Sequence, residues 1–383
     1  MGPSRTRVLF VQGAGVRAGA ERALMARLRH LPEHGIDPLV AFLADGPFRG
    51  EVERAGVPTL DLGAAPRLRD LARLPAAVRG LVAAARNEGV SVIEGCGEKM
   101  SVLAGWAARV ARCGSVYNLQ DAPARSLDAT AAQVAAACGR HDAVVVPSKW
   151  MADAFRRRLR LRARVIPNAI VLDELPDEAA DVRRLAGWPD DSIVVGFFGR
   201  LVRWKGAEVL LRAAREVRAA NPRVRLLLAG GSLYGLEPGY EARLRDDTAR
   251  LGLADSVHFA GHREDALGLM AGCDIVSHCS LEREPFGMAV LEAMALGRPV
   301  VASRLGGPAE LIDHGRTGRL VDAGDESGLA AELRALAEDP RAAGELGEAA
   351  RAEVRLRYAS DVVAGSLREL YLETAARPQR SAT

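Results

Sequence analysis

Two carboxylates stand eight residues apart around the expected start of a helix. Glu284 lies in a Glu-Pro-Phe-Gly turn, and Glu292 lies within a run of strong helix formers at residues 288–296. A helix that opens after Gly287 directs unpaired backbone N–H groups at whatever lies in front of it, and such an end favours anions, phosphate above all. Taken by itself, the same pattern is also typical of a buried helix whose glutamates are merely solvated.

Two cations occupy a loop in the same half of the chain. Arg200 and Lys205 follow an expected strand at residues 193–198 and precede an expected helix at residues 207–220. A phosphate group would rest at such a strand–loop–helix junction, where two fixed cations would neutralise its charge. Taken alone, two basic residues on a loop are usually only solvated.

The first half of the chain carries polar side chains where its expected strands end. Strands alternate with helices there, which predicts a parallel, doubly wound sheet that binds ligands at the carboxyl ends of its strands. The polar residues at the ends of two such strands are Glu94, Glu98, Asn118, Gln120 and Asp121. Carboxylates and amides in one cleft would suit a small polar ligand with hydroxyl and amine groups. Asp121 could instead cap the helix that follows it.

Several longer patterns resemble one enzyme family. Glu284 and Glu292 form a Glu–seven residues–Glu signature, which is followed by a Gly-x-Pro-Val-Val-Ala-Ser strand and a Gly-Gly loop. Arg200 and Lys205 lie in a Gly-Arg-x-x-x-x-Lys-Gly segment. These segments resemble the family 4 retaining glycosyltransferases, strongly from residue 199 to residue 325 and more weakly in the first half.

The resemblance implies a fold. It predicts an α/β protein of the GT-B type, in which two facing Rossmann-like domains with parallel sheets have a cleft between them. Residues 1–175 would form an acceptor-binding domain, and residues 176–360 would form a nucleotide-sugar-binding domain. Residues 361–383 would form a helix that crosses back to the first domain and ends in a frayed tail.

The resemblance also implies roles for individual residues. In this family the first glutamate contacts the donor sugar and the second contacts the nucleotide ribose, which here would be Glu284 and Glu292. Arg200 and Lys205 would bind the diphosphate, and together with Glu284 they are the predicted catalytic residues. The other predicted donor-binding residues are Gly15 and Gly19 of a glycine-rich loop, Arg263, Phe286, Gly287 and Met288.

One residue departs from the family pattern. Relatives usually carry a histidine near the reacting centre, where this chain has Gln120. A glutamine side chain forms hydrogen bonds but cannot take up a proton. A general base at this position is therefore not expected. The family's route, in which the leaving phosphate helps to deprotonate the acceptor hydroxyl, tolerates the change.

The predicted activity is transfer of a sugar from a nucleotide-diphosphate sugar to an acceptor hydroxyl with retained anomeric configuration. The lack of an Asp-x-Asp pair argues against a metal-dependent enzyme, and no cofactor is expected. The predicted acceptor is a small aminocyclitol or amino sugar of secondary metabolism, bound by Glu94, Glu98, Gln120 and Asp121. The open alternatives are a lipid-linked cell-envelope acceptor reached through the basic segment 156–164 and the basic helix expected at residues 67–86, a sugar-nucleotide epimerase, and a non-catalytic binding subunit.

Composition sets outer limits on these expectations. The 383 residues suffice for two domains, and a net charge of +3 is too small to indicate a nucleic-acid partner. The five cysteines are scattered and odd in number, as is typical of reduced thiols, and no apolar run approaches the length that crosses a bilayer. We therefore expect a cytoplasmic protein with a nucleotide-sugar donor and an acceptor as partners. Membrane contact is the less favoured alternative, and the sequence leaves the nucleotide base and the oligomeric state open.

Overall fold

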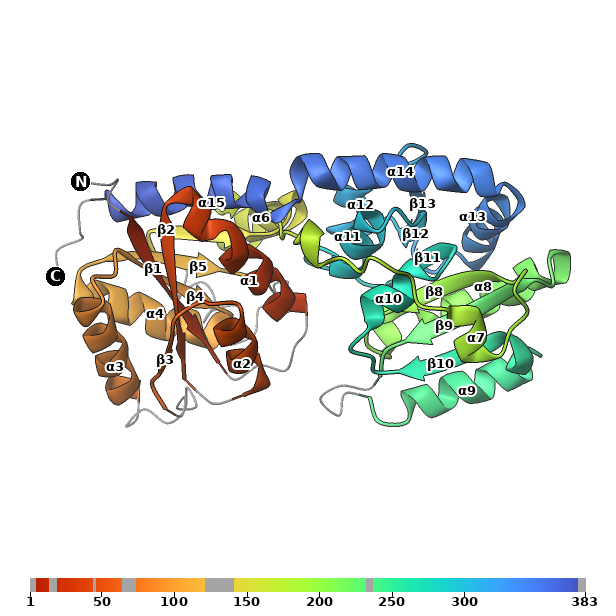
Figure 1. Cartoon of the computed structure of the whole chain (residues 1–383), viewed down its shortest axis with the longest axis horizontal. Coiled ribbons are helices and arrows are strands. Elements are labelled where there is room, and N and C mark those ends of the chain that lie inside the picture. The colour runs from red at the N-terminus through yellow and green to blue at the C-terminus, as the bar shows by residue number, and fades with distance from the viewer. Residues whose placement is uncertain are drawn as a thin grey trace. The chain divides into compact units, whose positions relative to one another are not determined.

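The structure is a computed structural model of the chain, and it describes residues 5–13, 19–43, 46–63, 74–120, 141–231 and 237–377. The chain divides into two compact units (Figure 1). Unit 1 comprises Met1–Val171 and Tyr358–Thr383, and unit 2 comprises Leu172–Arg357. Each unit is described by itself below.

Unit 1 contains a seven-stranded sheet in the order β3-β2-β1-β4-β5-β6-β7, with parallel pairing throughout. The interior strand β1 has a continuous apolar run at residues 8–11, as a strand needs to have when helices cover both faces of the sheet. The strands are β1 (Thr6–Gln12), β2 (Ile36–Phe42), β3 (Thr59–Asp61), β4 (Val92–Cys96), β5 (Gly114–Asn118), β6 (Ala143–Val146) and β7 (Arg164–Val165). The described α-helices are α1 (Gly19–His30), α2 (Pro47–Arg54), α3 (Leu74–Asn87), α4 (Glu98–Ala111), α6 (Lys149–Leu159) and α15 (Ser360–Ala375).

The last helix, α15, belongs to unit 1 and runs along the sheet in Figure 1. Its buried face includes Leu367, Leu370 and Tyr371, which join the hydrophobic core formed by β1, β2 and α1. The ring of Tyr371 meets the ring of Phe10 edge to face, with 6.2 Å between their centroids. The carboxyl-terminal helix is thereby a structural part of the first sheet's core.

The chain leaves and re-enters unit 1 at adjoining points. The N–H of Ile170 donates to the carbonyl of Tyr358 at 2.9 Å, and the N–H of Ser360 donates to the carbonyl of Ile170 at 2.9 Å. These two bonds join the outgoing and returning segments. The first unit therefore ends at Val171 and resumes at Tyr358, where the sequence predicted limits at residues 175 and 361.

Unit 2 contains a six-stranded parallel sheet in the order β10-β9-β8-β11-β12-β13. The strands are β8 (Ile193–Phe198), β9 (Val224–Ala229), β10 (Val257–Gly261), β11 (Ile275–His278), β12 (Val300–Ser303) and β13 (Arg319–Val321). The described helices are α7 (Val182–Ala186), α8 (Ala207–Ala220), α9 (Tyr240–Arg250), α10 (Ala266–Ala271), α11 (Met288–Ala295), α12 (Pro308–Leu311), α13 (Glu326–Glu338) and α14 (Pro340–Arg357). The prediction of two Rossmann-like units with parallel sheets is confirmed.

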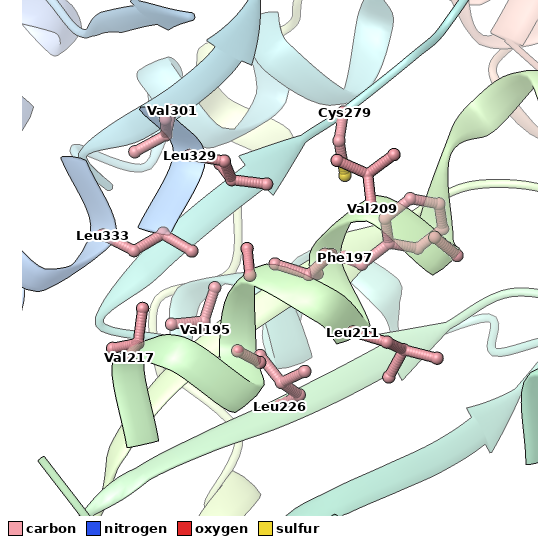
Figure 2. Packing of buried hydrophobic residues seen from close by; sticks show 14 of the residues in the cluster. Val195, Phe197, Val209, Leu211, Val217, Leu226, Cys279, Val301, Leu329 and Leu333 are labelled. Carbon is pink, nitrogen blue, oxygen red and sulfur yellow. The ribbon is translucent and has the colours of Figure 1, made fainter. Parts of the chain in front are cut away.

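Apolar side chains from four elements meet in the core of unit 2 (Figure 2). Val195 and Phe197 of β8 and Leu226 of β9 pack against Val209 of α8 and Leu329 of α13, and all of them are at least 97% buried. The helix α8 is amphipathic, with its apolar positions on the side that covers the sheet. This packing fixes the ends of β8 and β11, from which the loops of the candidate site start.

The cysteines and the absence of long apolar runs were two observations from composition that the structure also addresses. In the described part of the chain, Cys96, Cys113, Cys273 and Cys279 are free thiols, and Cys138 lies outside it. None of the helices in the described ranges combines the length and the apolar character needed to cross a bilayer.

Candidate functional site

The loop that carries Arg200 and Lys205 is held directly against the segment that follows β11. Gly206 ends this loop with φ +72°, a left-handed conformation, and a Cβ atom there would lie 2.0 Å from the carbonyl oxygen of Cys279. The N–H of Leu281 donates to the carbonyl of Trp204 at 2.7 Å. Only glycine permits so close an approach, and the approach brings two motifs that are far apart in the sequence into contact.

The contact joins the predicted cation to the predicted carboxylate. Lys205 Nζ forms an ion pair with Glu284 Oε1. His278 Nε2 lies 2.7 Å from the same oxygen, and the hydroxyl of Ser280 donates to it at 2.5 Å. Glu284 itself is only 7% exposed. The structure thus brings together Lys205 and Glu284, which the sequence predicted as catalytic, and adds two residues that the sequence analysis did not identify.

The surroundings of Glu284 favour its ionised form. Burial by itself raises the pKa of the Glu284 carboxyl group, but the neighbouring His278 and Lys205 outweigh burial and hold that pKa well below its ordinary value. The site therefore contains a buried, permanently negative carboxylate at neutral pH.

Arg200, the third predicted catalytic residue, lies on the same loop. Its guanidinium stacks over the ring of Trp204 at 5.6 Å from the centroid, and Lys205 Nζ lies 4.5 Å from the same centroid. The guanidinium of Arg200 forms no hydrogen bond or ion pair with any residue that the structure describes. Its five N–H donors therefore stay available for an anion.

The Gly-Gly loop packs under the turn that carries Glu284. The N–H of Gly307 donates to the carbonyl of Glu284 at 2.9 Å, and a Cβ atom on Gly307 would lie 2.3 Å from the Cα of Phe286. Gly287 precedes α11 with φ +97°, so the helix begins at Met288 and Glu284 lies on the loop before it. The first N–H groups of α11 have no acceptors within the helix and are free to bind an anion.

The other predicted donor-binding residues differ in their surroundings. Glu292 lies inside α11 and is only 4% exposed. Arg263 forms a bidentate pair with Asp265, with both N–O distances at 2.8 Å. Gly19 is the first residue of α1, whereas Gly15 lies outside the described residues. Within the described ranges, no cluster of three or more His, Cys, Asp or Glu side chains is suited to hold a metal ion.

One predicted acceptor residue is placed differently by the structure. Glu94 lies in β4 and is fully buried. Its Oε1 accepts from Arg27 Nη2 at 2.6 Å and from Asn118 Nδ2 at 3.0 Å, while its Oε2 accepts from the hydroxyl of Tyr371 at 2.7 Å. The prediction that Glu94 lines an acceptor surface is wrong, because its side chain points into the core and both oxygens are already satisfied.

The buried cluster around Glu94 continues to Gln120. Gln120 Nε2 donates to Asn118 Oδ1 at 2.8 Å, and Asn168 Nδ2 donates to Gln120 Oε1 at 2.9 Å. Gln120 is half-buried at the carboxyl end of β5 and is held by both of its polar atoms. Of the other predicted acceptor residues, Glu98 is the first residue of α4, and Asp121 lies outside the described residues.

Comparisons with known proteins agree with this geometry. A family model described as Glycosyltransferase Family 4 matches residues 17–174, and one described as Glycosyl transferases group 1 matches residues 180–353. The crystal structure of HepE from Anabaena in complex with UDP is 30% identical in sequence, with a TM-score of 0.83, and the match covers 96% of this chain and 100% of that chain. The chain belongs to the family 4 glycosyltransferases with the GT-B fold.

Other relatives of this family 4 chain differ in coverage. It is 37% identical over 219 residues to a D-inositol 3-phosphate glycosyltransferase from Stackebrandtia nassauensis, which is 54% of this chain and 48% of the relative. It is 34% identical over 184 residues to the lipopolysaccharide core biosynthesis glycosyltransferase LpsD from Rhizobium meliloti, covering 48% and 50%. The chain thus spans about half the length of the curated relatives it matches. A glycosyltransferase from Rickettsia africae, 17% identical over 98% of this chain and 100% of that chain with a TM-score of 0.85, shares the fold.

The sequence analysis of this family 4 chain missed His278 and Ser280. A usable signal existed, because both lie where β11 ends, the kind of position at which parallel sheets bind ligands. That signal is weak, because a polar residue at the end of a buried strand becomes conspicuous only when its partner in the fold, here Glu284, is known. Arg27 and Tyr371 were missed for a different reason, since they are 344 positions apart and meet only in the folded core.

A cavity of about 270 Å³ lies elsewhere in unit 1, at the amino ends of β4 and β5. It is lined by Arg109, Arg112 and Arg377 together with Asp142. The carboxyl ends of α4 and α15 also border it, and the partial negative charge of these helix ends offsets part of the positive charge of the arginines. The cavity therefore lacks the strong positive character of an anion site, and it lies at the end of the sheet opposite to Gln120.

Proposed function

We propose that the protein transfers a sugar from a uridine-diphosphate sugar to an acceptor hydroxyl. The observation that carries this proposal is the direct contact between Lys205 of the Gly-Arg-x-x-x-x-Lys-Gly loop and Glu284 of the Glu–seven residues–Glu segment. The contact places a cation, a carboxylate and the start of α11 at one point on the sheet of unit 2. HepE, which has been solved with UDP and with UDP-glucose, supports the choice of nucleotide.

The donor end of the reaction follows from these groups. Breaking the bond between the anomeric carbon and the diphosphate leaves negative charge on the departing phosphate, and preorganised donors lower the energy of that state. Arg200 offers its guanidinium, Lys205 has two N–H donors beyond the one on Glu284, and α11 offers its first backbone N–H groups. We propose that these groups balance the charge without a metal ion.

For the attack by the acceptor, we propose the stereochemistry of the family, which retains the anomeric configuration. Front-face attack with retained configuration lets the leaving phosphate take the proton of the acceptor hydroxyl. Gln120 then needs only to donate and accept hydrogen bonds, which its fixed amide does. We propose a small polyol of the cyclitol class as the acceptor, since several curated relatives are named D-inositol 3-phosphate glycosyltransferase. The loss of Glu94 from the acceptor wall weakens the case for an amine on that acceptor.

A lipid-linked acceptor is the second candidate, and it rests on the basic segment 156–164. Arg156, Arg157 and Arg160 are exposed there. Arg164, however, pairs with Glu369 at 3.1 Å and with Glu373 at 2.9 Å, both on α15. Part of the positive charge is therefore neutralised within unit 1, which weakens attraction to an anionic membrane.

The test is to incubate the purified protein with UDP-glucose and other nucleotide sugars, with and without myo-inositol, D-inositol 3-phosphate and simple amino sugars. Release of UDP that depends on an acceptor, together with a product that keeps the donor's anomeric configuration by NMR, supports the proposal. Altered sugar nucleotide without acceptor would identify an epimerase, and binding without turnover would identify a non-catalytic subunit. Turnover abolished by EDTA and restored by magnesium would refute the metal-free route. Sedimentation with anionic liposomes at physiological salt would favour the lipid-linked acceptor.

A further inference from the structure

The carboxylate of Glu284 is held by only one of its two oxygens. Lys205, His278 and Ser280 all contact Oε1. None of the residues that the structure describes donates a hydrogen bond to Oε2. A carboxylate oxygen has lone pairs for about two hydrogen bonds, so Oε2 keeps its full capacity to accept. The side chain is therefore fixed in direction while one oxygen stays free to receive a donor.

His278 makes its polar contacts through one nitrogen. Nε2 lies 2.7 Å from Glu284 Oε1 and 3.4 Å from the hydroxyl of Ser280. Nδ1 is buried, and no residue in the described part of the chain partners it. A leucine or phenylalanine could fill this place at the end of β11 without leaving a buried polar atom unpaired. Among the described residues, the cost of burying an imidazole here is offset by its short bond to Glu284 and its longer contact with Ser280.

The same geometry excludes His278 as the group that touches the substrate. Nε2 already faces Glu284, and Nδ1 is sealed from solvent. Neither nitrogen is placed to exchange a proton with a bound molecule. The residue can act on the reaction only by holding Glu284.

We propose that His278 is a positioning residue of the donor site, which together with Ser280 fixes Glu284 so that Oε2 accepts a hydrogen bond from a hydroxyl of the donor sugar. This inference rests on the proposed function, because it takes the ligand of Glu284 to be a sugar. It also assigns the two oxygens different tasks: Oε1 anchors the carboxylate, and Oε2 binds.

The test uses UDP-glucose as the probe and three variants of the full chain. His278→Phe keeps the ring and removes the donor, whereas His278→Gln keeps an N–H at a similar reach. His278→Phe should lower kcat for UDP release by about 10- to 100-fold, the size expected for a hydrogen bond to a charged group, while the Kd of UDP stays within about twofold. His278→Gln should recover most of the loss. His258→Phe is the matched control, because His258 is a half-buried histidine of β10 that packs edge-on against Trp188, a contact that phenylalanine preserves.

A double-mutant cycle decides whether His278 acts through Glu284. The double variant His278→Phe with Glu284→Gln should be no slower than Glu284→Gln alone, because the group that His278 holds is already lost. The proposal is overturned if the double variant loses kcat by the product of the two single losses. It is also overturned if His278→Phe lowers UDP affinity as much as it lowers kcat. If the wild-type protein releases no UDP from any nucleotide sugar, the proposed function fails. The same cycle, measured on the free energy of unfolding, then tests the contact between His278 and Glu284, and additive effects there overturn it.

Discussion

Glu94 in unit 1 and Glu284 in unit 2 are two buried carboxylates that the sequence analysis both assigned to ligand binding, and the structure separates them. Glu94 lies within β4 and Glu284 lies on the loop after β11, and each is paired with a cation, Arg27 or Lys205. Glu94 uses both oxygens on Arg27, Asn118 and Tyr371. Glu284 receives its three partners on one oxygen only.

Under the proposed function, this difference separates a structural carboxylate from one that binds the donor sugar. A carboxylate whose two oxygens both accept hydrogen bonds holds secondary-structure elements together, and Glu94 joins α1, β4, β5 and α15. Burial and the Glu94 carboxylate raise the pKa of Tyr371 well above its ordinary value, so the tyrosine hydroxyl remains a donor. Burial opposes the charge of Arg27, yet Glu94 holds the pKa of that guanidinium above its ordinary value. Burial and charge pairing alone therefore do not distinguish the two carboxylates, whereas the oxygen of Glu284 that receives no donor from the described residues does.

The largest effect is expected from removing the charge of Glu94. Glu94→Gln leaves the buried guanidinium of Arg27 without a counter-ion, and breaking a buried pair in this way typically costs about 3–5 kcal/mol of stability. Urea denaturation of the variant measures this loss. Glu33→Gln on the surface of the same unit is the control and should change stability by less than about 0.5 kcal/mol. If Glu94→Gln is as stable as the wild type, Glu94 does not have the structural role that separates it from Glu284.

Removing the charge in unit 2 should affect turnover more than stability. Lys205→Ala and Glu284→Ala are each expected to lower kcat for UDP release by about 10²- to 10³-fold, because both act where charge develops. Steady-state kinetics with UDP-glucose provides the measurement. Arg203→Ala is the matched control, since Arg203 lies on the same loop but is 65% exposed and pairs with Glu237. Near-normal kcat in Lys205→Ala would exclude that residue from the mechanism.

Tyr371→Phe sharpens the comparison at a smaller scale. The variant removes one donor from Glu94 Oε2 and keeps the ring contact with Phe10. The expected loss of stability is about 1.5–3 kcal/mol, which is the usual cost of a hydrogen bond to a charged group. The affinity for UDP, followed by calorimetry, should stay unchanged because the proposed nucleotide site is in unit 2. A loss of UDP affinity equal to the loss of stability would argue that the two carboxylates do not have separate tasks.

The smallest expected effect is a pH dependence of stability at Glu284. The pKa of this carboxyl group is lowered in the folded protein below its ordinary value of about 4.5, so its contribution to stability is complete above that pH. As the pH falls below about 4.5, the unfolded chain takes up a proton that the folded chain does not, and the contribution declines. The stability gap between wild type and Glu284→Gln should therefore narrow on acidification. Chemical denaturation at several pH values tests this, and a constant gap contradicts it.

The sequence by itself determined the fold class and named the candidate residues of the proposed donor site. Alternating apolar strands and amphipathic helices predict parallel sheets, because both periodicities are local properties of the chain. The motifs around Arg200, Lys205, Glu284 and Glu292 are also local, since each needs only a strand, a loop and a helix in order. Gly206 and Gly307 also belong to these motifs, but the reason that each must be glycine is tertiary, a close backbone approach that leaves no room for a side chain.

Only the tertiary structure decided what each charged side chain does. Glu94 lies within a strand and Glu284 lies on a loop, and each has a partner from a distant segment: Tyr371 is 277 positions from Glu94, and Lys205 is 79 positions from Glu284. Whether a carboxylate keeps a free oxygen depends on which donors the packed elements bring to it. A local sequence pattern cannot record this, because donors such as Tyr371 and Lys205 reach these carboxylates only through long-range packing.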